Sequence, residues 1–189
     1  MSSNLRQLVA SLRMMLVLTV LLGVLYPAAV WGIGRVAFAD QAGGSLVRHD
    51  GAVVGSSLLG QDFQDARFFQ GRPSTSEYAG GVSGGSNLAA SDPDQVKAVK
   101  ERAAAYLATN SGSATADALT ASSSGLDPQI SPANARAQAD RVAAANGLQA
   151  AEVMRLVQAN TQGRSLGFLG EPRVNVLELN LAVQDAAGR

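Results

Sequence analysis

The 189-residue sequence has no cysteine and only one histidine, His49. These absences exclude disulfide bonds, thiolate metal sites and the common zinc-ligand sets. A phosphate-binding loop of the G-x-x-x-x-G-K-[ST] type is also excluded, because the only lysines, Lys97 and Lys100, do not follow such a glycine pattern. Asp92 and Asp94 lack the spacing and the glycine of a calcium loop. We therefore predict no bound metal and no cofactor held directly by this chain.

Acidic residues are absent before Asp40, whereas Arg6, Arg13 and Arg35 all precede it. The rest of the chain carries 15 acidic and 12 basic residues. This weakly acidic balance does not favour a nucleic-acid partner, which would need a clustered Lys/Arg surface. Aromatic residues make up only 5% of the chain. We expect a small, lightly packed domain with few large side chains in its core.

One long apolar run, Met14 to Gly34, has no charged residue in 21 positions. As a helix it would span about 32 Å, close to the roughly 30 Å of a bilayer's hydrocarbon. The run therefore predicts a transmembrane helix. A cleaved signal peptide is the alternative, since Ala37-Phe38-Ala39 fits a cleavage site, but signal cores are usually shorter.

The arginines Arg6 and Arg13 favour a cytoplasmic N-terminus under the positive-inside rule. The predicted organisation is a cytoplasmic tail at 1–13, an anchor at 14–36 and an extracytoplasmic domain at 37–189. Pro27 is expected to free the carbonyl of Gly23 and bend the helix. Gly23, Pro27 and Trp31 are our candidates for packing against partner helices, although glycine and proline are also common in any membrane helix.

Short elements follow the anchor. The turn signal Asp50-Gly51 predicts a β-hairpin from Ser45 to Leu59. Phe63, Phe68 and Phe69 are expected in the core. A long Gly/Ser-rich loop is predicted from Gly71 to Ser91.

Helices are predicted next, because cap residues precede apolar positions at helical spacing. The first begins at Ser91 or Asp92, and its apolar face consists of Val96, Val99, Ala103, Tyr106 and Leu107. The second runs from Ser131-Pro132 to Gly147. The third runs from Leu148 to Ala159, with Gly163 as its stop. The segment Leu166 to Val183 suits a strand or a helix, with the helix slightly favoured. The predicted class is α+β: one transmembrane helix followed by a small extracytoplasmic α/β domain.

The string Gly81-Val82-Ser83-Gly84-Gly85 matches the spelling of a hydrolase nucleophile elbow. That site needs a strand-to-helix turn and a later histidine, whereas His49 lies upstream. Amides around Gly84 and Gly85 could instead cradle an anion, or the loop could be a tight turn packed on the domain. Arg67 and Arg72 are candidates for pairing with a partner's carboxylate.

Several longer strings occur in a fixed order and carry a family resemblance. They are LLGVLYP (Leu21 to Pro27), VVGSSLLGQ (Val53 to Gln61), ARFFQGRPS (Ala66 to Ser74), SGGSNL (Ser83 to Leu88), SSSGLDPQISPANA (Ser122 to Ala135) and GRSLGFLGEPRVNVLELNLA (Gly163 to Ala182). Along essentially its whole length the chain resembles the KdpC family, the C subunit of the bacterial Kdp potassium-transporting ATPase. It departs from the family pattern at Gln70 and Gln129, where histidine is common.

The resemblance implies a non-catalytic accessory subunit that helps a complex take up K⁺ with ATP. Its partners would be a KdpA-like channel subunit, a KdpB-like P-type ATPase subunit and a KdpF-like small subunit within the lipid bilayer. SGGSNL is similar to the ABC-transporter signature, which suggests nucleotide contacts at Ser83, Gly84, Gly85, Ser86 and Asn87; ATP would otherwise be met only through the B subunit. The predicted topology favours instead a domain that caps the channel's outer mouth and acts on ATP binding allosterically. The alternative function is a stand-alone, membrane-anchored anion-binding module.

Overall fold

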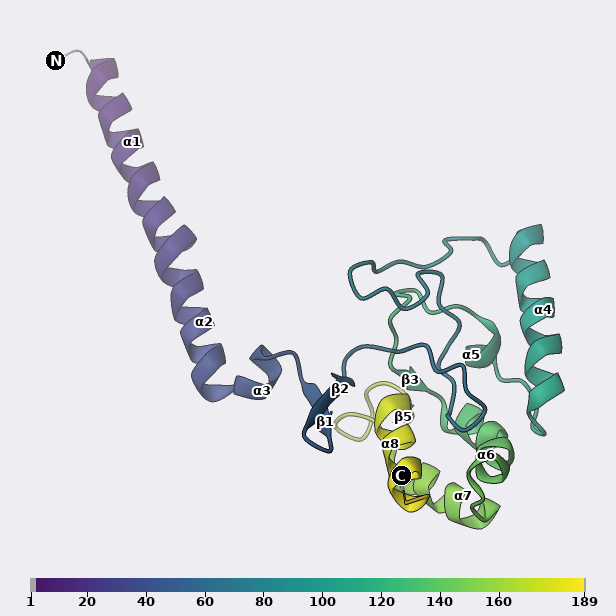
Figure 1. The fold of residues 1–189 in the computed structure, drawn as a ribbon. Coiled ribbons are helices and arrows are strands. Elements are labelled where there is room, and N and C mark those ends of the chain that lie inside the picture. Colours follow the sequence, from purple (N-terminus) through teal and green to yellow (C-terminus); the bar gives the residue numbers. More distant parts are fainter. Residues whose placement is uncertain (1–2, 189) are drawn as a thin grey trace. The chain divides into compact units, whose positions relative to one another are not determined.

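The computed structural model describes residues 3–188 and divides the chain into two compact units, Met1–Leu46 and Val47–Arg189 (Figure 1). The first unit is helical, and the second mixes helices with small sheets. The predicted α+β class, with one long N-terminal apolar helix, is confirmed.

The first unit is dominated by one continuous helical rod, Ser3–Ala37, of 35 residues. It consists of α1 (Ser3–Val20), a π-helical turn η1 (Leu21–Leu25) and α2 (Tyr26–Ala37), and a single turn, α3 (Ala39–Ala42), follows. Within the described residues 3–188 it is the one helix long and apolar enough to cross a membrane, with a mean hydropathy of 2.4. None of the side chains in its most apolar stretch is buried in the protein. The apolar side chains of the rod are thus exposed, and an exposed apolar surface of this length suits an apolar environment.

A wide helical turn precedes Pro27. The N–H of Tyr26 donates to the carbonyl of Leu21, five residues earlier, and the π-helical turn is followed by α2 with Pro27 in its first turn. Proline has no N–H, and its ring crowds the carbonyl of the preceding helical turn. A π-helical turn holds one more residue than an α-helical turn, and this extra residue relieves the crowding. The structure has a π-helical turn directly before Pro27, while the bend expected there stays a prediction.

The second unit begins with the predicted hairpin. Strands β1 (Leu46–His49) and β2 (Ala52–Ser56) are hydrogen-bonded neighbours. The turn residues Asp50 and Gly51 both have positive φ, at 49° and 79°. Positive φ at both turn positions is typical of a type I′ turn, whose twist matches that of the strands, so Asp-Gly is the suitable pair.

Three helices and a small sheet form the body of the second unit. The helices are α6 (Pro132–Asn146), α7 (Ala150–Ala159) and α8 (Val176–Ala186). The antiparallel sheet has the order β3-β5-β4, with β3 at Gln129–Ile130, β5 at Arg173–Asn175 and β4 at Thr161–Gln162. Because β5 runs directly into α8, the last segment is strand first and then helix, and the favoured helix is confirmed for 176–186.

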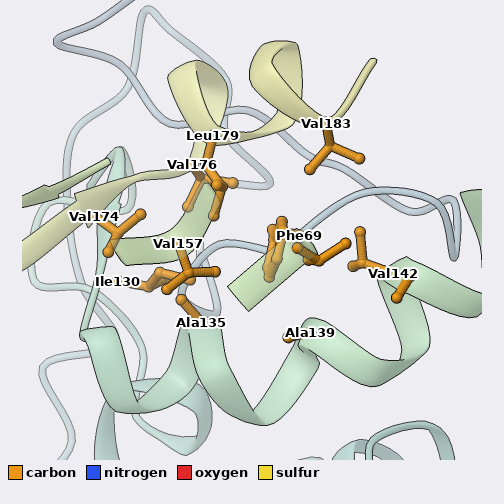
Figure 2. Packing of buried hydrophobic residues seen from close by; sticks show 12 residues of the cluster. Phe69, Ile130, Ala135, Ala139, Val142, Val157, Val174, Val176, Leu179 and Val183 are labelled. Atoms are coloured by element: carbon orange, nitrogen blue, oxygen red, sulfur yellow. The ribbon is translucent and has the colours of Figure 1, made fainter. Parts of the chain in front are cut away.

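The core lies between these helices and the central strand β5. Figure 2 shows Phe69 within the cluster, among Val142 and Ala139 of α6 and Val183 of α8. The buried members are Phe69, Ile130, Ala135, Ala139, Val142, Ala143, Val153, Val157, Val174, Val176, Leu179 and Val183. Phe69 is the only aromatic ring among them and is fully buried. Phe63 and Phe68, also expected in the core, are only partly buried and pack against each other, with 5.5 Å between ring centroids.

Helix α4 (Pro93–Thr109) forms where predicted but buries less than predicted. Asp92 is its N-cap and accepts a hydrogen bond from the N–H of Asp94. None of its residues is buried, and Val96 and Leu107 of the predicted apolar face are 39% and 57% exposed. Helix α4 contacts mainly the short helix α5 (Ala116–Leu119), so little apolar surface is there to cover it.

Local cap signals set the other helix ends. Ser131 caps α6 by accepting from the N–H of Asn134, and Gly147 ends it in the left-handed conformation, as predicted. The third predicted helix ends at Ala159 as predicted, but Gly163 is not what stops it. Asn160 is the C-cap of α7, and the chain then enters β4, which is held by pairing with β5.

Candidate functional site

The extended segment 66–74, which carries the string ARFFQGRPS, is held by amide side chains of distant helices. The N–H of Phe69 donates to Oδ1 of Asn180 at 2.7 Å, and Nδ2 of Asn180 donates to the carbonyl of Phe69 at 3.0 Å. Gln138 binds the next residue in the same way, at 2.8 Å and 3.1 Å from the N–H and C=O of Gln70. Two side-chain amides thus replace the neighbouring strand that an extended segment usually needs.

The same segment is tied to α6 by a half-buried arginine. Arg141 donates through Nη1 to the carbonyls of Ala66 and Phe68, at 2.6 Å and 3.0 Å, and through Nη2 to Gln138. Burial lowers the pKa of Arg141, and Tyr106 opposes that effect. Because these carbonyl oxygens have strong dipoles, they satisfy a cation without a carboxylate.

Arg67 and Arg72, predicted to meet a partner's carboxylate, are paired inside the domain. Arg67 binds Asp65 through Nε and Nη2, at 2.7–3.1 Å. Arg72 donates through Nη1 to Asp127 at 3.1 Å. These pairs hold the segment and the 120–127 loop in place, so neither guanidinium is presented to solvent as an unpaired charge.

The loop with the string SGGSNL is packed against residues 122–125. The N–H of Gly84 donates to the carbonyl of Ser124 at 2.9 Å, and the Gly84 carbonyl accepts from Thr75 at 3.0 Å. A Cβ on Gly85 would lie 3.2 Å from backbone atoms of Ser123, so only glycine allows this close approach. The amide that an anion cradle would need at Gly84 is already in use. The geometry favours the packed turn over the anion site.

The remaining nucleotide candidates of this loop, Ser83, Ser86 and Asn87, are exposed. Ser83 lies in a stretch without regular structure, with no strand directly before it and no helix until Pro93, so it does not form a nucleophile elbow. Within residues 3–188, no three His, Cys, Asp or Glu side chains form a group that could hold a metal ion.

A cleft of about 480 Å³ separates the 61–78 segment from α4. Its lining includes Arg72, Tyr78, Arg102, Tyr106 and Gln138. The Tyr78 hydroxyl donates to the carbonyl of Arg72, and the Tyr106 hydroxyl donates to Oδ1 of Asn134 at 2.9 Å. Most polar groups of the cleft therefore bind other parts of the domain, and α4 is attached to the body largely through them.

A half-buried carboxylate, Asp117, lies on the short helix α5. Asp117 accepts from the N–H and the hydroxyl of Ser131, at 2.7 Å and 3.0 Å, and from Nδ2 of Asn134 at 3.2 Å. Burial by itself would raise the pKa of Asp117, but these hydrogen bonds outweigh it and the pKa is lowered. The ionised form thus joins α5 to the start of α6.

The two tyrosines of the cleft are expected to ionise only at very alkaline pH. The pKa of Tyr78 is raised to about 12, mainly by burial and to a smaller extent by the negative charges of Asp62 and Asp127. The pKa of Tyr106 is also raised to about 12, mainly by burial and to a smaller extent by the charge of Asp117. Because an unfolded tyrosine ionises near 10, the contribution of these two rings to stability should be constant below about pH 10 and be lost as the pH rises from there toward 12. Phenolate absorbance during an alkaline titration of the full chain measures this, with Tyr78→Phe removing one step. Ionisation of both rings near pH 10 in folded protein would contradict it.

On the long apolar helix, Gly23, Pro27 and Trp31 are all exposed, with Trp31 at 69%. Gly23 lies inside the π-helical turn, and a Cβ there would meet only Thr19 of its own helix, at 3.9 Å. The helix therefore has room at Gly23 for the close approach of another helix.

The family of the chain follows from comparison with known proteins. The family model described as "KdpC: K+-transporting ATPase, c chain" matches residues 8–185. The chain belongs to the KdpC family. The resemblance predicted from the ordered strings is confirmed, and the chain is a subunit of the K⁺-transporting ATPase type.

Similar relatives carry the name "Potassium-transporting ATPase KdpC subunit". That of Sorangium cellulosum is 53% identical over 182 residues, covering 93% of this chain and 96% of the relative. That of Cereibacter sphaeroides is 49% identical over 188 residues and covers 100% of both chains. That of Kineococcus radiotolerans is 51% identical over 193 residues, covering 99% and 97%. The similarity therefore includes both the apolar helix and the second unit.

Three positioning residues of this KdpC-family domain escaped the sequence reasoning: Gln138, Arg141 and Asn180. A signal for Asn180 was present, because an amide stands among apolar neighbours that turn out to be buried, such as Leu179 and Val183. A polar group at a core position must find a hydrogen-bond partner. The sequence pattern did not identify the backbone of Phe69 as the hydrogen-bond partner of Asn180.

Proposed function

We propose that this chain is the accessory subunit of a high-affinity, ATP-driven K⁺ uptake complex in a bacterial inner membrane. It would assemble with a KdpA-like channel subunit, a KdpB-like P-type ATPase subunit and a KdpF-like small subunit. Family membership supports this proposal, as does an apolar helix that finds no cover within its own chain. Gly23, Pro27 and Trp31 are the proposed contacts of that helix with partner helices.

The second unit is proposed to lie outside the cytoplasm, with the N-terminus inside. Arg6 and Arg13 before the apolar run, without a nearby acid, support this orientation. From this side the domain would cap the outer mouth of the K⁺-conducting subunit. A domain whose polar side chains are largely committed to its own backbone is suited to act as a rigid cap.

The subunit is proposed to promote ATP binding by the catalytic subunit indirectly. The observation that carries this proposal is the hydrogen bond from Gly84 to Ser124, because it occupies the amide that a phosphate would need. Without that amide, the SGGSNL loop offers exposed serine and asparagine side chains but no preformed backbone cradle. The effect on ATP would then be a coupling between two distinct sites on opposite sides of the membrane.

Thiol labelling tests the orientation, because the chain has no cysteine of its own. Ser83→Cys in the assembled complex is expected to react with a membrane-impermeant maleimide added to spheroplasts, and not when the reagent reaches only the cytoplasmic face. Ser3→Cys is the matched control and should show the opposite pattern. Labelling of Ser83→Cys from the cytoplasmic side alone would overturn the cap and favour direct contact with nucleotide.

A further inference from the structure

The connection between β4 and β5 is a long hairpin that extends beyond the sheet. Thr161 pairs with Val174 and Gln162 with Arg173. Arg164 and Glu171 continue this register, and Nη2 of Arg164 lies 2.9 Å from both carboxylate oxygens of Glu171. The ion pair therefore closes the hairpin outside the last backbone pair of the sheet.

The hairpin narrows beyond the ion pair. Ser165 and Leu169 exchange two backbone hydrogen bonds, each 2.9 Å long. Gly170 is then an extra residue on the returning side, and its φ of +76° is the conformation of a glycine bulge. The tip, residues 166–168, is thus held in one shape by its own backbone.

This tip presents apolar side chains to solvent. Leu166 is 82% exposed, Phe168 69% and Leu169 49%. Leu166 also has a φ of +53°, which costs a leucine about 1–2 kcal/mol. A strained backbone that holds an apolar side chain in water gives the domain itself no benefit, and such features concentrate at functional sites.

A groove of about 650 Å³, lined by apolar side chains and by charged side chains of both signs, lies beside the tip. One wall is the hairpin, with Ser165, Leu169 and Glu171, and the other includes Asp127 and Gln129. An apolar centre with a polar, partly hydrated rim is the usual anatomy of a protein–protein interface.

We propose that the hairpin tip and this groove form the docking surface for another protein subunit of the ATPase complex. That subunit would supply an apolar pocket for Leu166, Phe168 and Leu169 and polar groups for the groove. The proposal rests on the proposed function and adds to it the surface through which the domain binds. A fixed tip loses little conformational entropy on binding, which favours a lasting contact.

The observations favour protein over lipid as the occupant. Shallow insertion into a bilayer needs only apolar side chains with basic neighbours. Here Arg164 is neutralised by Glu171, and the groove beside the tip has carboxylates, such as Asp127, among its apolar lining residues. Specific interfaces cover about 800 Å² on each partner. Each of the three exposed side chains of the tip can bury roughly 150–250 Å² or less, so together they fall short of that area. The groove is therefore needed to complete the surface.

Leu166→Asn combined with Phe168→Ser tests the proposal with little risk to folding. Asparagine tolerates positive φ better than leucine does, and both side chains are exposed. The variant subunit is expected to bind the other subunits of the complex at least tenfold more weakly, measured by co-purification and by titration into complexes that lack this subunit. Leu107→Asn on α4, a leucine that is 57% exposed and lies outside the hairpin and the groove, is the control and should bind as the unmodified subunit does.

The outcomes separate this surface from the proposed function. Full binding by the double variant, with thermal unfolding unchanged, would place the contact elsewhere and overturn the proposal, while the accessory role would stand. If the unmodified subunit does not bind the others either, the proposed function itself fails. Should the double variant fold poorly, Leu166→Asn alone, with its unfolding temperature checked, still gives the comparison.

Cross-linking identifies the occupant. A benzophenone maleimide attached to Phe168→Cys in the assembled complex is expected to give an adduct with another subunit of the transporter. An adduct with phospholipid alone, with a second copy of this chain, or no adduct at all would overturn the proposal.

Discussion

Phe69→Ala is expected to lower the free energy of unfolding of the second unit by about 3–5 kcal/mol, the cost of truncating a buried phenylalanine. Phe69 is fully buried and is the only aromatic ring in the core cluster. Its neighbours include Ala139 and Val142 (Figure 2), small side chains that cannot fill the space it would leave. Since domains are stable by only about 5–15 kcal/mol, this one change removes a large share of the total.

The measurement is chemical unfolding of the purified full chain in detergent, followed by circular dichroism. Fluorescence is unsuitable, because the single tryptophan, Trp31, lies in the N-terminal apolar helix and outside the second unit. Phe168→Ala is the matched control: the same atoms are removed from a side chain that is 69% exposed, and stability should change by less than about 0.5 kcal/mol. Equal effects of both variants would contradict the assigned core.

A functional consequence follows from the same residue. Phe69 stands in the segment that also carries Arg67 and Arg72, whose ion pairs fix the neighbouring loops. Loss of the ring would release that segment from α6 and α8 while leaving the anchor intact. Such a variant should reach the membrane and yet fail to support K⁺ uptake.

Local chemistry explains which parts of the fold were predictable. The hairpin turn at Asp50-Gly51 and the caps at Asp92, Ser131 and Gly147 each depend on a few adjacent residues, and all appear as predicted. These signals act within one turn of chain, so no knowledge of the tertiary structure is needed.

The failures have a different physical origin. The apolar face expected on α4 includes Val96 and Leu107, which remain exposed, because periodicity identifies an apolar stripe but not whether anything covers it. The end of α7 at Ala159 was predicted, but not that Asn160 caps it or that the chain then pairs as β4 with β5, which is a tertiary contact. Asp65, two residues from Arg67, could have been recognised as its partner, whereas Asp127 is 55 residues from Arg72.

The family motifs become understandable once these distant contacts are known. The string with Ala66 to Ser74 lies against the helix that carries Gln138 and the helix that carries Asn180. The SGGSNL loop meets the serine-rich string around Ser124. These strings look like separate sites along the chain, but in space they hold one another. Their first task is to build a rigid domain, and the exposed hairpin tip is then held on that domain.

Asn180→Leu is the second change with a large expected effect, about 2–6 kcal/mol of lost stability. It keeps the branched shape and the number of heavy atoms, with methyl groups somewhat larger than the amide, but leaves the buried N–H and C=O of Phe69 without partners. Each unsatisfied buried group costs about 1–3 kcal/mol, so the loss should exceed that of an ordinary exposed substitution even though a more apolar residue enters the core. Unfolding of the full chain in detergent measures it; a neutral or stabilising effect would mean that the amide clamp is not needed.

Asn180→Asp separates the two hydrogen bonds of that clamp by their dependence on pH. An ionised carboxylate still accepts from the N–H of Phe69 but faces its carbonyl with negative charge, whereas a protonated one can donate to that carbonyl. Burial should raise the folded pKa of the new carboxyl above its unfolded value of about 3.9. The variant's stability deficit should therefore be smallest below about pH 4 and grow as the pH rises through the folded pKa.

Asn87→Asp, exposed and at a φ of 54° that aspartate tolerates, is the control and should show no such trend. A deficit of Asn180→Asp that does not change with pH would mean that the carbonyl of Phe69 does not depend on this donor.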